Sequence, residues 1–364
     1  MSRLWSRKAA ALVPYVPGEQ PQDRRYIKLN TNENPYPPSP AVAAALQAFD
    51  PAALRLYPDP QSRGLRAALG KEHGVPAENV FVGNGSDEIL AFAFQAFFEP
   101  SPAGGAVPPE AHVLFPDVTY SFYPVYAALY GIPYRTPPLA DDFSVAVEDY
   151  LGPCAGVVLP NPNAPTGRAL PLAGLARIAA GQPDRVLVVD EAYVDFGAET
   201  ALPLAASRDN VLVVRTMSKA RSLAGLRLGY AIGPRPLVEA LERVRDSFNS
   251  YTVDRIAQTL AIAALSDPAW FERTRTEVME TRGRTARRLG KLGFEVVPSD
   301  ANFLFAKPPG MAGEALYEAL KERGILVRYF RKPRIDGHVR ITVGTPEEMD
   351  ALCVEAARLL GAGG

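Results

Sequence analysis

The sequence contains few of the residues that build metal sites and disulfide frameworks. Its 364 residues include only two cysteines, Cys154 and Cys353, and three histidines, His73, His112 and His338. Two cysteines cannot form a disulfide framework, and none of these five residues has the short spacing of a zinc site. We therefore expect no metal, and a reducing cytoplasmic location.

The chain also lacks an excess of one charge and a long hydrophobic run. Its 39 basic and 40 acidic residues leave a formal net charge of −1, which gives no electrostatic reason to bind nucleic acid or an anionic membrane. Apolar runs such as Ala257 to Leu265 are interrupted by polar residues and are too short to span a bilayer. The apolar stretch from Ala9 to Val13 is too short for a signal peptide. Small molecules remain as the expected partners.

The length of the chain favours two domains. Residues 1–40 are rich in proline and polar side chains and read as an extended arm. In residues 41–250, short apolar runs alternate with helical stretches, which predicts an α/β domain with a mainly parallel sheet buried on both faces. In residues 251–364, long helical patterns and short β-type runs predict a smaller α+β domain. Residues 99–109 are expected to form an exposed loop.

Lys219 is the most informative residue. It follows the apolar run that starts at Val211, with the hydroxyls of Thr216 and Ser218 beside it and Arg227 eight residues further on. A lysine next to a hydroxyl and arginine anion site is what pyridoxal phosphate requires, because the lysine forms a Schiff base with the cofactor. Taken alone, Lys219 could also be a solvated loop lysine.

Asp190 and Tyr193 follow a second apolar run, Val186-Leu-Val-Val. A carboxylate at the end of a buried strand needs a cationic or hydrogen-bonding partner. The pyridinium nitrogen of the cofactor would be such a partner, and the carboxylate would keep it protonated. A buried aspartate bonded to nearby backbone amides is the alternative.

Two loops follow other predicted strands. In Gly83-Asn-Gly-Ser86-Asp87-Glu88, a strand turns into a helix, and free backbone amides there favour a phosphate. The alternative is an ordinary turn with Ser86 as the helix N-cap. Asn161-Pro-Asn163-Ala-Pro-Thr-Gly is a rigid turn that could aim an amide at the cleft, or only cap its own loop. The order of the motifs carries the prediction, because successive parallel strands end at one edge of a sheet.

With these motifs in this order, the chain resembles the fold-type I aminotransferases, and among them the histidinol-phosphate aminotransferase family. Further matching segments are Leu29-Asn-Thr-Asn-Glu-Asn-Pro, Tyr57-Pro-Asp-Pro, Thr119-Tyr-Ser-Phe-Tyr, Thr216-Met-Ser-Lys-Ala-Arg-Ser-Leu-Ala-Gly-Leu-Arg and Val339-Arg-Ile-Thr-Val-Gly-Thr. The resemblance implies exchange of an amino group between L-histidinol phosphate and 2-oxoglutarate in histidine biosynthesis. It also implies the cofactor pyridoxal phosphate.

The resemblance also implies roles for individual residues. Lys219 would bind the cofactor and move the proton, and Asp190 would pair with the ring nitrogen. Asn163 and Tyr193 would bind the phenolic oxygen, and Tyr120 would stack on the ring. Many relatives carry a second asparagine where this chain has Ala164. The residues expected at the cofactor phosphate are Ser86, Asp87, Thr216, Ser218, Arg227 and, from the neighbouring subunit, Tyr57. This last contact implies a homodimer with two shared active sites.

Arg328 and Arg340 are the candidates for binding the substrate anion, because a guanidinium can hold either a carboxylate or a phosphate in a bidentate manner. Tyr15 and Asn32 are expected in the same pocket. Three alternatives stay open: an aromatic amino-acid transaminase, a threonine-phosphate decarboxylase, and a non-catalytic binding protein on the same fold.

Overall fold

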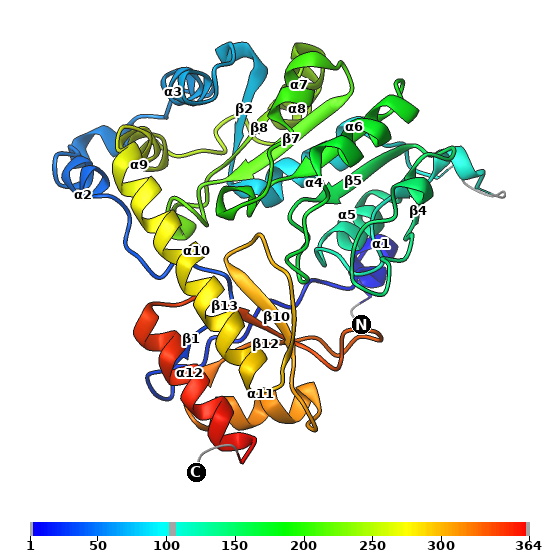
Figure 1. Ribbon diagram of the computed structural model, residues 1–364. Helices are drawn as coiled ribbons and strands as arrows, with labels where there is room; N and C mark the ends of the chain where they lie inside the picture. The colour runs from blue at the N-terminus through cyan, green and yellow to red at the C-terminus, as the bar shows by residue number, and fades with distance from the viewer. Residues whose placement is uncertain (1–2, 102–106, 362–364) are drawn as a thin grey trace.

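The structure is a computed structural model that describes residues 3–101 and 107–361 (Figure 1). Part of the loop expected at 99–109 lies outside the described residues. The α-helices are α1 (Arg7–Ala11), α2 (Pro40–Gln47), α3 (Arg63–His73), α4 (Gly85–Phe97), α5 (Tyr123–Tyr130), α6 (Leu172–Gly181), α7 (Leu202–Ser207), α8 (Arg235–Phe248), α9 (Arg255–Leu265), α10 (Pro268–Lys291), α11 (Gly313–Glu322) and α12 (Pro346–Leu359). In the two described ranges, no helix has both the length and the apolar surface to cross a membrane.

A seven-stranded sheet forms the larger part of the molecule, with the strand order β2-β8-β7-β6-β5-β3-β4. The strands are β2 (Val80–Gly83), β3 (Val113–Leu114), β4 (Tyr134–Arg135), β5 (Gly156–Pro160), β6 (Val186–Asp190), β7 (Val211–Thr216) and β8 (Gly229–Ile232). The neighbouring strands β4, β3, β5, β6 and β7 pair in parallel, in this spatial order. Strand β8 runs antiparallel to both β7 and β2. The mainly parallel sheet confirms the predicted fold class.

Helices cover both faces of this sheet, because successive strand residues point to opposite sides. Val188 packs in a cluster with α4, α5 and α8, whereas its neighbour Val189 packs in a cluster with α6 and α7. A third cluster joins α3 and α9 to β2 and β8. The apolar runs are therefore buried on both faces, and the polar residues that follow them lie at the sheet edge.

A four-stranded antiparallel sheet, of order β12-β13-β10-β9, forms the smaller part. Its strands are β9 (Glu295–Val297), β10 (Phe303–Lys307), β12 (Arg328–Tyr329) and β13 (Val339–Thr342). Residues of α10, α11 and α12 share a hydrophobic core with it. The helix α12 begins with a capping box, in which Thr345 and Glu348 bond each other's backbone amides.

The N-terminal arm crosses to the smaller part. Strand β1 (Ile27–Lys28) pairs in parallel with β11 (Ile325–Leu326), so the arm is joined to a segment close to the C-terminus (Figure 1). Beyond β1, the arm passes back toward the edge of the large sheet. The predicted boundaries near residues 40 and 250 stay predictions, and the arm links the two parts.

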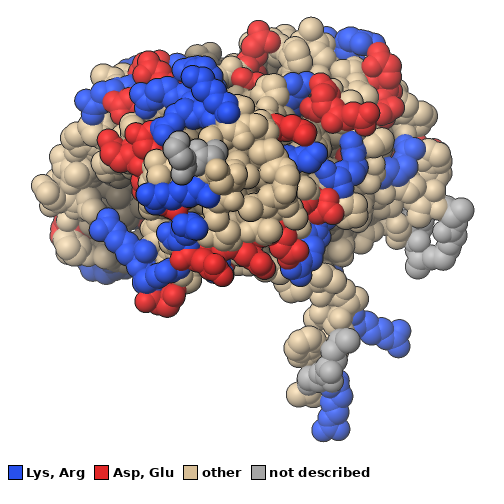
Figure 2. Space-filling view, turned by 60° about the horizontal axis from the view of Figure 1, so that its bottom comes forward, with Lys and Arg blue, Asp and Glu red and all other residues tan. Residues whose placement is uncertain are grey.

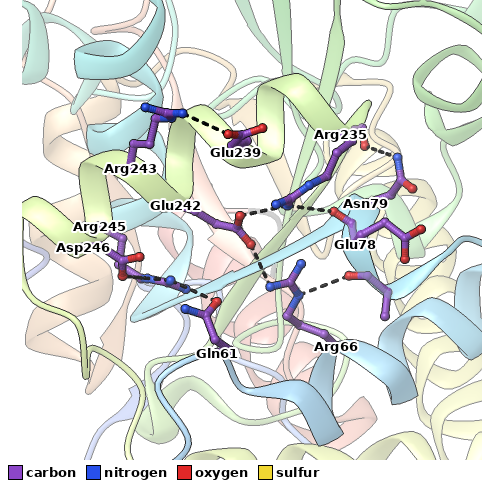
Figure 3. A network of polar contacts seen from close by, with 12 residues as sticks. Gln61, Arg66, Glu78, Asn79, Arg235, Glu239, Glu242, Arg243, Arg245 and Asp246 are labelled. Carbon is purple, nitrogen blue, oxygen red and sulfur yellow. Dashed lines mark hydrogen bonds and ion pairs between the residues drawn. The ribbon is translucent and has the colours of Figure 1, made fainter.

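A polar network joins α3 and its preceding loop to α8 (Figure 3). Glu242 pairs with Arg66 at 2.7 Å and with Arg235 at 2.8 Å, and Arg245 donates to Gln61 at 3.2 Å. Arg255, the first residue of α9, also holds this loop, because its side chain donates a hydrogen bond to the backbone carbonyl of Tyr57 at 2.7 Å. The network therefore fixes the backbone of the loop that presents Tyr57.

Candidate active site

A cavity of about 230 Å³ lies at the carboxyl ends of β5, β6 and β7. The arm closes one side of it, and β12 and β13 close another. Most of the predicted site residues line this cavity: Tyr15, Asn32, Ser86, Asp87, Tyr120, Asp190, Tyr193, Thr216, Ser218, Lys219, Arg227, Arg328 and Arg340. Asn163 and Tyr57 do not.

Lys219 follows β7 and reaches into the cavity. Its Nζ donates to the backbone carbonyl of Thr31 in the arm, at 3.1 Å. Burial, and then the charge of Arg340, lower the pKa of Lys219 to about 8. About a tenth of its amine is therefore neutral at pH 7, and the neutral form is the one that acts as a nucleophile and a proton acceptor.

Asp190 is the last residue of β6 and is 5% exposed. Its Oδ2 accepts a hydrogen bond from the hydroxyl of Tyr123 at 2.9 Å, and its Oδ1 accepts one from the backbone amide of Ala192 at 3.2 Å. Burial raises the pKa of Asp190 to about 6, although the Tyr123 hydroxyl opposes this rise. Both donors are neutral, so a cationic ring nitrogen in the cavity would supply the charge that this carboxylate lacks.

The expected phosphate site is assembled at the start of α4. This helix begins at Gly85, and the N-cap residue Asn84 makes no side-chain cap, so the interpretation of Ser86 as N-cap is wrong. Gly85 has a φ of +82°, and a Cβ there would lie 2.9 Å from Arg227 Nη2. Only glycine lets the backbone and Arg227 approach this closely. The first amides of α4 and the Arg227 guanidinium therefore share one anion site.

Asp87 contributes differently from its neighbours. Its carboxylate pairs with Arg227 at 3.0 Å and accepts a hydrogen bond from the Tyr120 hydroxyl at 2.7 Å. A carboxylate would repel a phosphate, so the side chain of Asp87 serves to orient Arg227 and Tyr120. Opposite them, Thr216 donates to Ser218 through their hydroxyls at 2.9 Å.

Asn163 does not reach the cavity, contrary to prediction. It is 2% exposed, and its Nδ2 donates to the carbonyl of Val118 at 3.1 Å and to the hydroxyl of Thr166 at 2.9 Å. Its neighbour Ala164 lines the cavity instead. The Nδ2 of Asn163 is therefore engaged by Val118 and Thr166, while its buried Oδ1 has no hydrogen-bond partner among the described residues.

Tyr193 is oriented by the arm. Its hydroxyl accepts a hydrogen bond from Asn32 Nδ2 at 3.0 Å, and its ring meets Phe303 edge-on at 5.0 Å. Asn32 has a φ of +56°, and its backbone amide donates to the hydroxyl of Thr342 at 2.9 Å. The hydroxyl of Thr342 donates in turn to Asn32 Oδ1 at 3.1 Å. Asn32, predicted as a substrate ligand, therefore links β13 to Tyr193.

Arg328 and Arg340 lie opposite each other on β12 and β13. Arg340 donates to the carbonyl of Asn30 at 3.0 Å, and its buried Nε has no partner among the described residues. Arg328 donates to the carbonyls of Val16 and Pro17 at 3.2 and 3.3 Å. Two adjacent guanidinium groups, one of them with an unpartnered donor, have the chemistry to bind a single anion.

Two of the aromatic residues lie in contrasting places. Tyr15 stacks on Phe122 at 4.4 Å between ring centres and forms part of the cavity wall. Tyr57 is 78% exposed and stacks on Tyr251 at 4.6 Å, outside the cavity. Tyr57 therefore lies on the surface, away from the cavity of its own chain.

Sequence reasoning missed three contributors to the site: Tyr123, Thr31 and Ala164. Tyr123 belongs to the Thr119-Tyr-Ser-Phe-Tyr segment, but nothing in the segment tells which of its tyrosines faces Asp190. Thr31 acts through its backbone carbonyl, which no side-chain pattern reveals. Ala164 stands out in the sequence only as a departure from many relatives.

Comparisons with known proteins agree with this geometry. Residues 24–355 match the family described as aminotransferase class I and II. Histidinol-phosphate aminotransferase 1 of Burkholderia pseudomallei is 54% identical over 365 residues, which cover 100% of both chains. Histidinol-phosphate aminotransferase 2 of Dechloromonas aromatica is 53% identical, over 99% of this chain and 100% of its own. The crystal structure of histidinol-phosphate aminotransferase from Sinorhizobium meliloti, in complex with pyridoxal-5'-phosphate, is 25% identical, with a TM-score of 0.86 over 100% of this chain and 99% of that one.

Proposed function

The chain belongs to the class I and II aminotransferase family, whose cofactor is pyridoxal phosphate, and we propose that it exchanges the amino group between L-histidinol phosphate and 2-oxoglutarate. The observation that carries this proposal is more than 50% identity, over nearly the whole length, to relatives named histidinol-phosphate aminotransferase. The reaction would serve histidine biosynthesis.

The residues around the cavity fit pyridoxal phosphate. The amides of Ser86 and Asp87, with Thr216, Ser218 and Arg227, would hold its phosphate, and Asp190 would face its ring nitrogen. Tyr120 would lie against the ring, and Tyr193 would contact its phenolic oxygen. When bound, the cofactor supplies a ring that withdraws electrons from the carbon that gains or loses a proton.

Lys219 has two tasks in this scheme. It would hold the cofactor covalently, and its Nζ would accept and return a proton. A pKa of about 8 suits both directions of transfer near neutral pH. The carbonyl of Thr31, 3.1 Å from Nζ, orients the amine without adding a charge.

The pair Arg328 and Arg340 gives the substrate assignment a physical basis. One substrate presents a phosphate ester and the other presents carboxylates, and a guanidinium can bind either anion through two parallel hydrogen bonds. The unpartnered Nε of Arg340 is positioned for such a contact. The aromatic wall that includes Tyr15 would then lie beside the imidazole ring.

Single-turnover measurements of each half-reaction test the substrate assignment. The purified holoenzyme is mixed with histidinol phosphate, phenylalanine or threonine phosphate, and the cofactor absorbance is followed. Fast amino transfer from histidinol phosphate is expected. Fast transfer from phenylalanine alone would identify an aromatic transaminase, and release of carbon dioxide from threonine phosphate would identify a decarboxylase.

A homodimer with shared sites belongs to the same proposal. Tyr57, Phe248 and Tyr251 are 78%, 73% and 43% exposed, more than a single chain explains for large apolar side chains. The segment around α1 also projects from the body of the molecule (Figure 2), with Trp5 58% exposed. A second copy would cover these side chains and place Tyr57 at its neighbour's cofactor phosphate.

Mixing two inactive variants tests this arrangement. Tyr57→Ala subunits and Lys219→Ala subunits each damage a different part of the shared site, so a mixed dimer keeps one intact site. Activity should therefore return on mixing and subunit exchange. A fully active monomer in sedimentation experiments would contradict the arrangement.

We also propose a reducing, cytoplasmic location. Cys154 and Cys353 are both buried and unpaired. Buried thiols of this kind are stable in a reducing compartment.

A further inference from the structure

We propose that Tyr123 is a positioning residue, whose hydroxyl holds the carboxylate of Asp190 in one orientation beside the cavity and in its ionised form. The proposal deepens the function proposed above, since it takes Asp190 as the residue that faces the cofactor ring nitrogen. It assigns a role to a side chain that does not line the cavity.

The contact is a hydrogen bond of ordinary length between two buried side chains. Tyr123 is 0% exposed and Asp190 is 5% exposed, and the hydroxyl donates to Asp190 Oδ2 at 2.9 Å. The ring of Tyr123 is fixed by Phe94 and Phe115, whose ring centres lie 6.2 and 5.7 Å away. A phenol buried in this way cannot turn to another partner, so it constrains the carboxylate rather than following it.

The other titratable neighbours of Asp190 cannot supply the hydrogen bond that Tyr123 donates. The titratable groups that face it are Tyr123 and Tyr126 of α5, Asp87 of α4, Glu191 beside it in the chain, and Tyr193. Asp87 and Glu191 are both acids and oppose ionisation of Asp190. Their charges are engaged elsewhere, Asp87 by Arg227 and Glu191 by Arg215 at 2.9 Å.

The balance of these effects depends on Tyr123. Burial raises the pKa of Asp190, and Tyr123 is the strongest influence that lowers it. Without the hydroxyl, the carboxyl group would keep one backbone donor, the amide of Ala192. The group would then be protonated over much of the neutral pH range, and a protonated carboxyl cannot hold a ring nitrogen in its charged form.

Helix α5 also supplies a matched control. Tyr126 is 5% exposed on the same helix, and its buried hydroxyl has no hydrogen-bond partner among the described residues. Tyr123→Phe and Tyr126→Phe thus each remove one buried hydroxyl from α5. Only the first removes a bond to Asp190.

The first experiment measures Asp190 directly in the full chain without cofactor. Carboxyl carbon resonances of ¹³C-labelled aspartate are titrated by NMR, and Asp190 is assigned by its loss in Asp190→Asn. Tyr123→Phe should raise the pKa of Asp190 by about 1 to 2, the effect of one hydrogen bond to a charged group. Tyr126→Phe should leave it unchanged. Equal behaviour of the two variants would overturn the proposal.

The second experiment uses the holoenzyme. A higher pKa of Asp190 means that the carboxylate is present only at higher pH, so the acidic limb of the kcat profile should move upward in Tyr123→Phe. Once the midpoint of this limb lies above pH 7, kcat at pH 7 should fall about tenfold for each further pH unit, with little change in KM. It should recover as the pH rises. In the Asp190→Asn background, Tyr123→Phe should have no further effect on cofactor affinity. An additive loss would contradict the proposal.

The two experiments separate failure of this inference from failure of the proposed function. A higher Asp190 pKa without any change in cofactor affinity or kcat would support Tyr123 as the positioning residue and overturn the proposed role of Asp190. If Tyr123→Phe does not fold, 3,5-difluorotyrosine at position 123 gives a test of opposite sign. Its more acidic hydroxyl should lower the Asp190 pKa, and an unchanged pKa would overturn the proposal.

Discussion

The two sides of the cavity are built in different ways. The sheet side consists of Asp190, Tyr193, Thr216, Ser218 and Lys219, which lie at the ends of the buried strands β6 and β7 or just after them. The arm side consists of residues 15–34 of the arm together with Arg328 and Arg340. On the sheet side, Asp190, Thr216 and Ser218 bond to neighbours in the larger part of the molecule, and Lys219 and Tyr193 also bond to the arm. On the arm side, both arginines donate to backbone carbonyls of the arm.

The sheet side is therefore preorganised for its ligand, whereas the arm side can adapt to different ligands. The sheet side presents its cofactor-binding groups in one arrangement before any ligand arrives, which favours binding and catalysis. On the arm side, an incoming anion must compete with carbonyl oxygens for Arg328 and Arg340. Such a site can accept a phosphate ester and then a carboxylate, because neither anion is matched by a rigid set of donors.

The largest effect is expected on the sheet side, at Lys219. Lys219→Met should reduce turnover to background, because the side chain can neither hold the cofactor covalently nor move the proton. Steady-state assays at saturating cofactor measure this loss. Substantial remaining activity would show that the sheet side does not carry the chemistry.

The same variant should be more stable than the wild type when both lack cofactor. The pKa of Lys219 is depressed to about 8 in the folded chain, so the unfolded chain binds more protons between about pH 8 and 10.5. The free energy of unfolding of the wild type therefore rises with pH across this window. Below pH 8, the buried Lys219 lowers it by the full amount. Chemical denaturation at pH 7 should favour Lys219→Met by about 3 kcal/mol, and the two proteins should converge near pH 10.5.

Asp190→Asn should have the next largest effect. The variant keeps the shape of the side chain but loses the charge that supports a protonated ring nitrogen. We expect kcat to fall about a hundred- to a thousandfold, as for other single groups that stabilise charge in a transition state, with a smaller change in cofactor affinity. A near-normal kcat at saturating cofactor would exclude this role.

On the arm side, Arg340→Lys should have an intermediate effect. The charge is kept but the fork of donors is lost, so kcat/KM should fall about ten- to a hundredfold in both half-reactions. Replacing the half-buried Arg328 by lysine should lower kcat/KM by a smaller factor. If only one half-reaction were affected, the two substrates would not share this anion site.

Asn32→Gly should have the smallest effect and probes the contact between the two sides. Glycine accepts the positive φ of this position, so the substitution removes the two side-chain hydrogen bonds of Asn32, the one it donates to Tyr193 and the one it accepts from Thr342. We expect a three- to tenfold decrease in kcat, from about 0.5–1.5 kcal/mol. The decrease should vanish in a Tyr193→Phe background; if it persists there, Asn32 does not act through Tyr193.

Apolar runs in the sequence predict where the sheet side lies, whereas Tyr15, Asn32, Arg328 and Arg340 of the arm side were predicted without the backbone contacts that hold them. Asp190 and Lys219 stand next to apolar runs whose burial fixes where each strand ends, so their positions follow from local pattern. The strands β1, β4 and β11 have only two residues each, too few for any pattern. Pattern also cannot give the direction of a side chain within a loop. For this reason Asn163 was placed in the cavity although its amide turns to Val118.

The contact between Asn32 and Thr342 has a consequence for how the protein is made. These residues are 310 positions apart in the chain. At about 5–20 residues per second on a ribosome, roughly 15–60 s pass between synthesis of the first residue and synthesis of the second. The segment around Asn32 must wait during this time without its partner, while the large sheet can already assemble. A nascent chain that stops before Thr342 could therefore fold its sheet, yet Asn32 would lack the Thr342 contacts that hold it beside Tyr193.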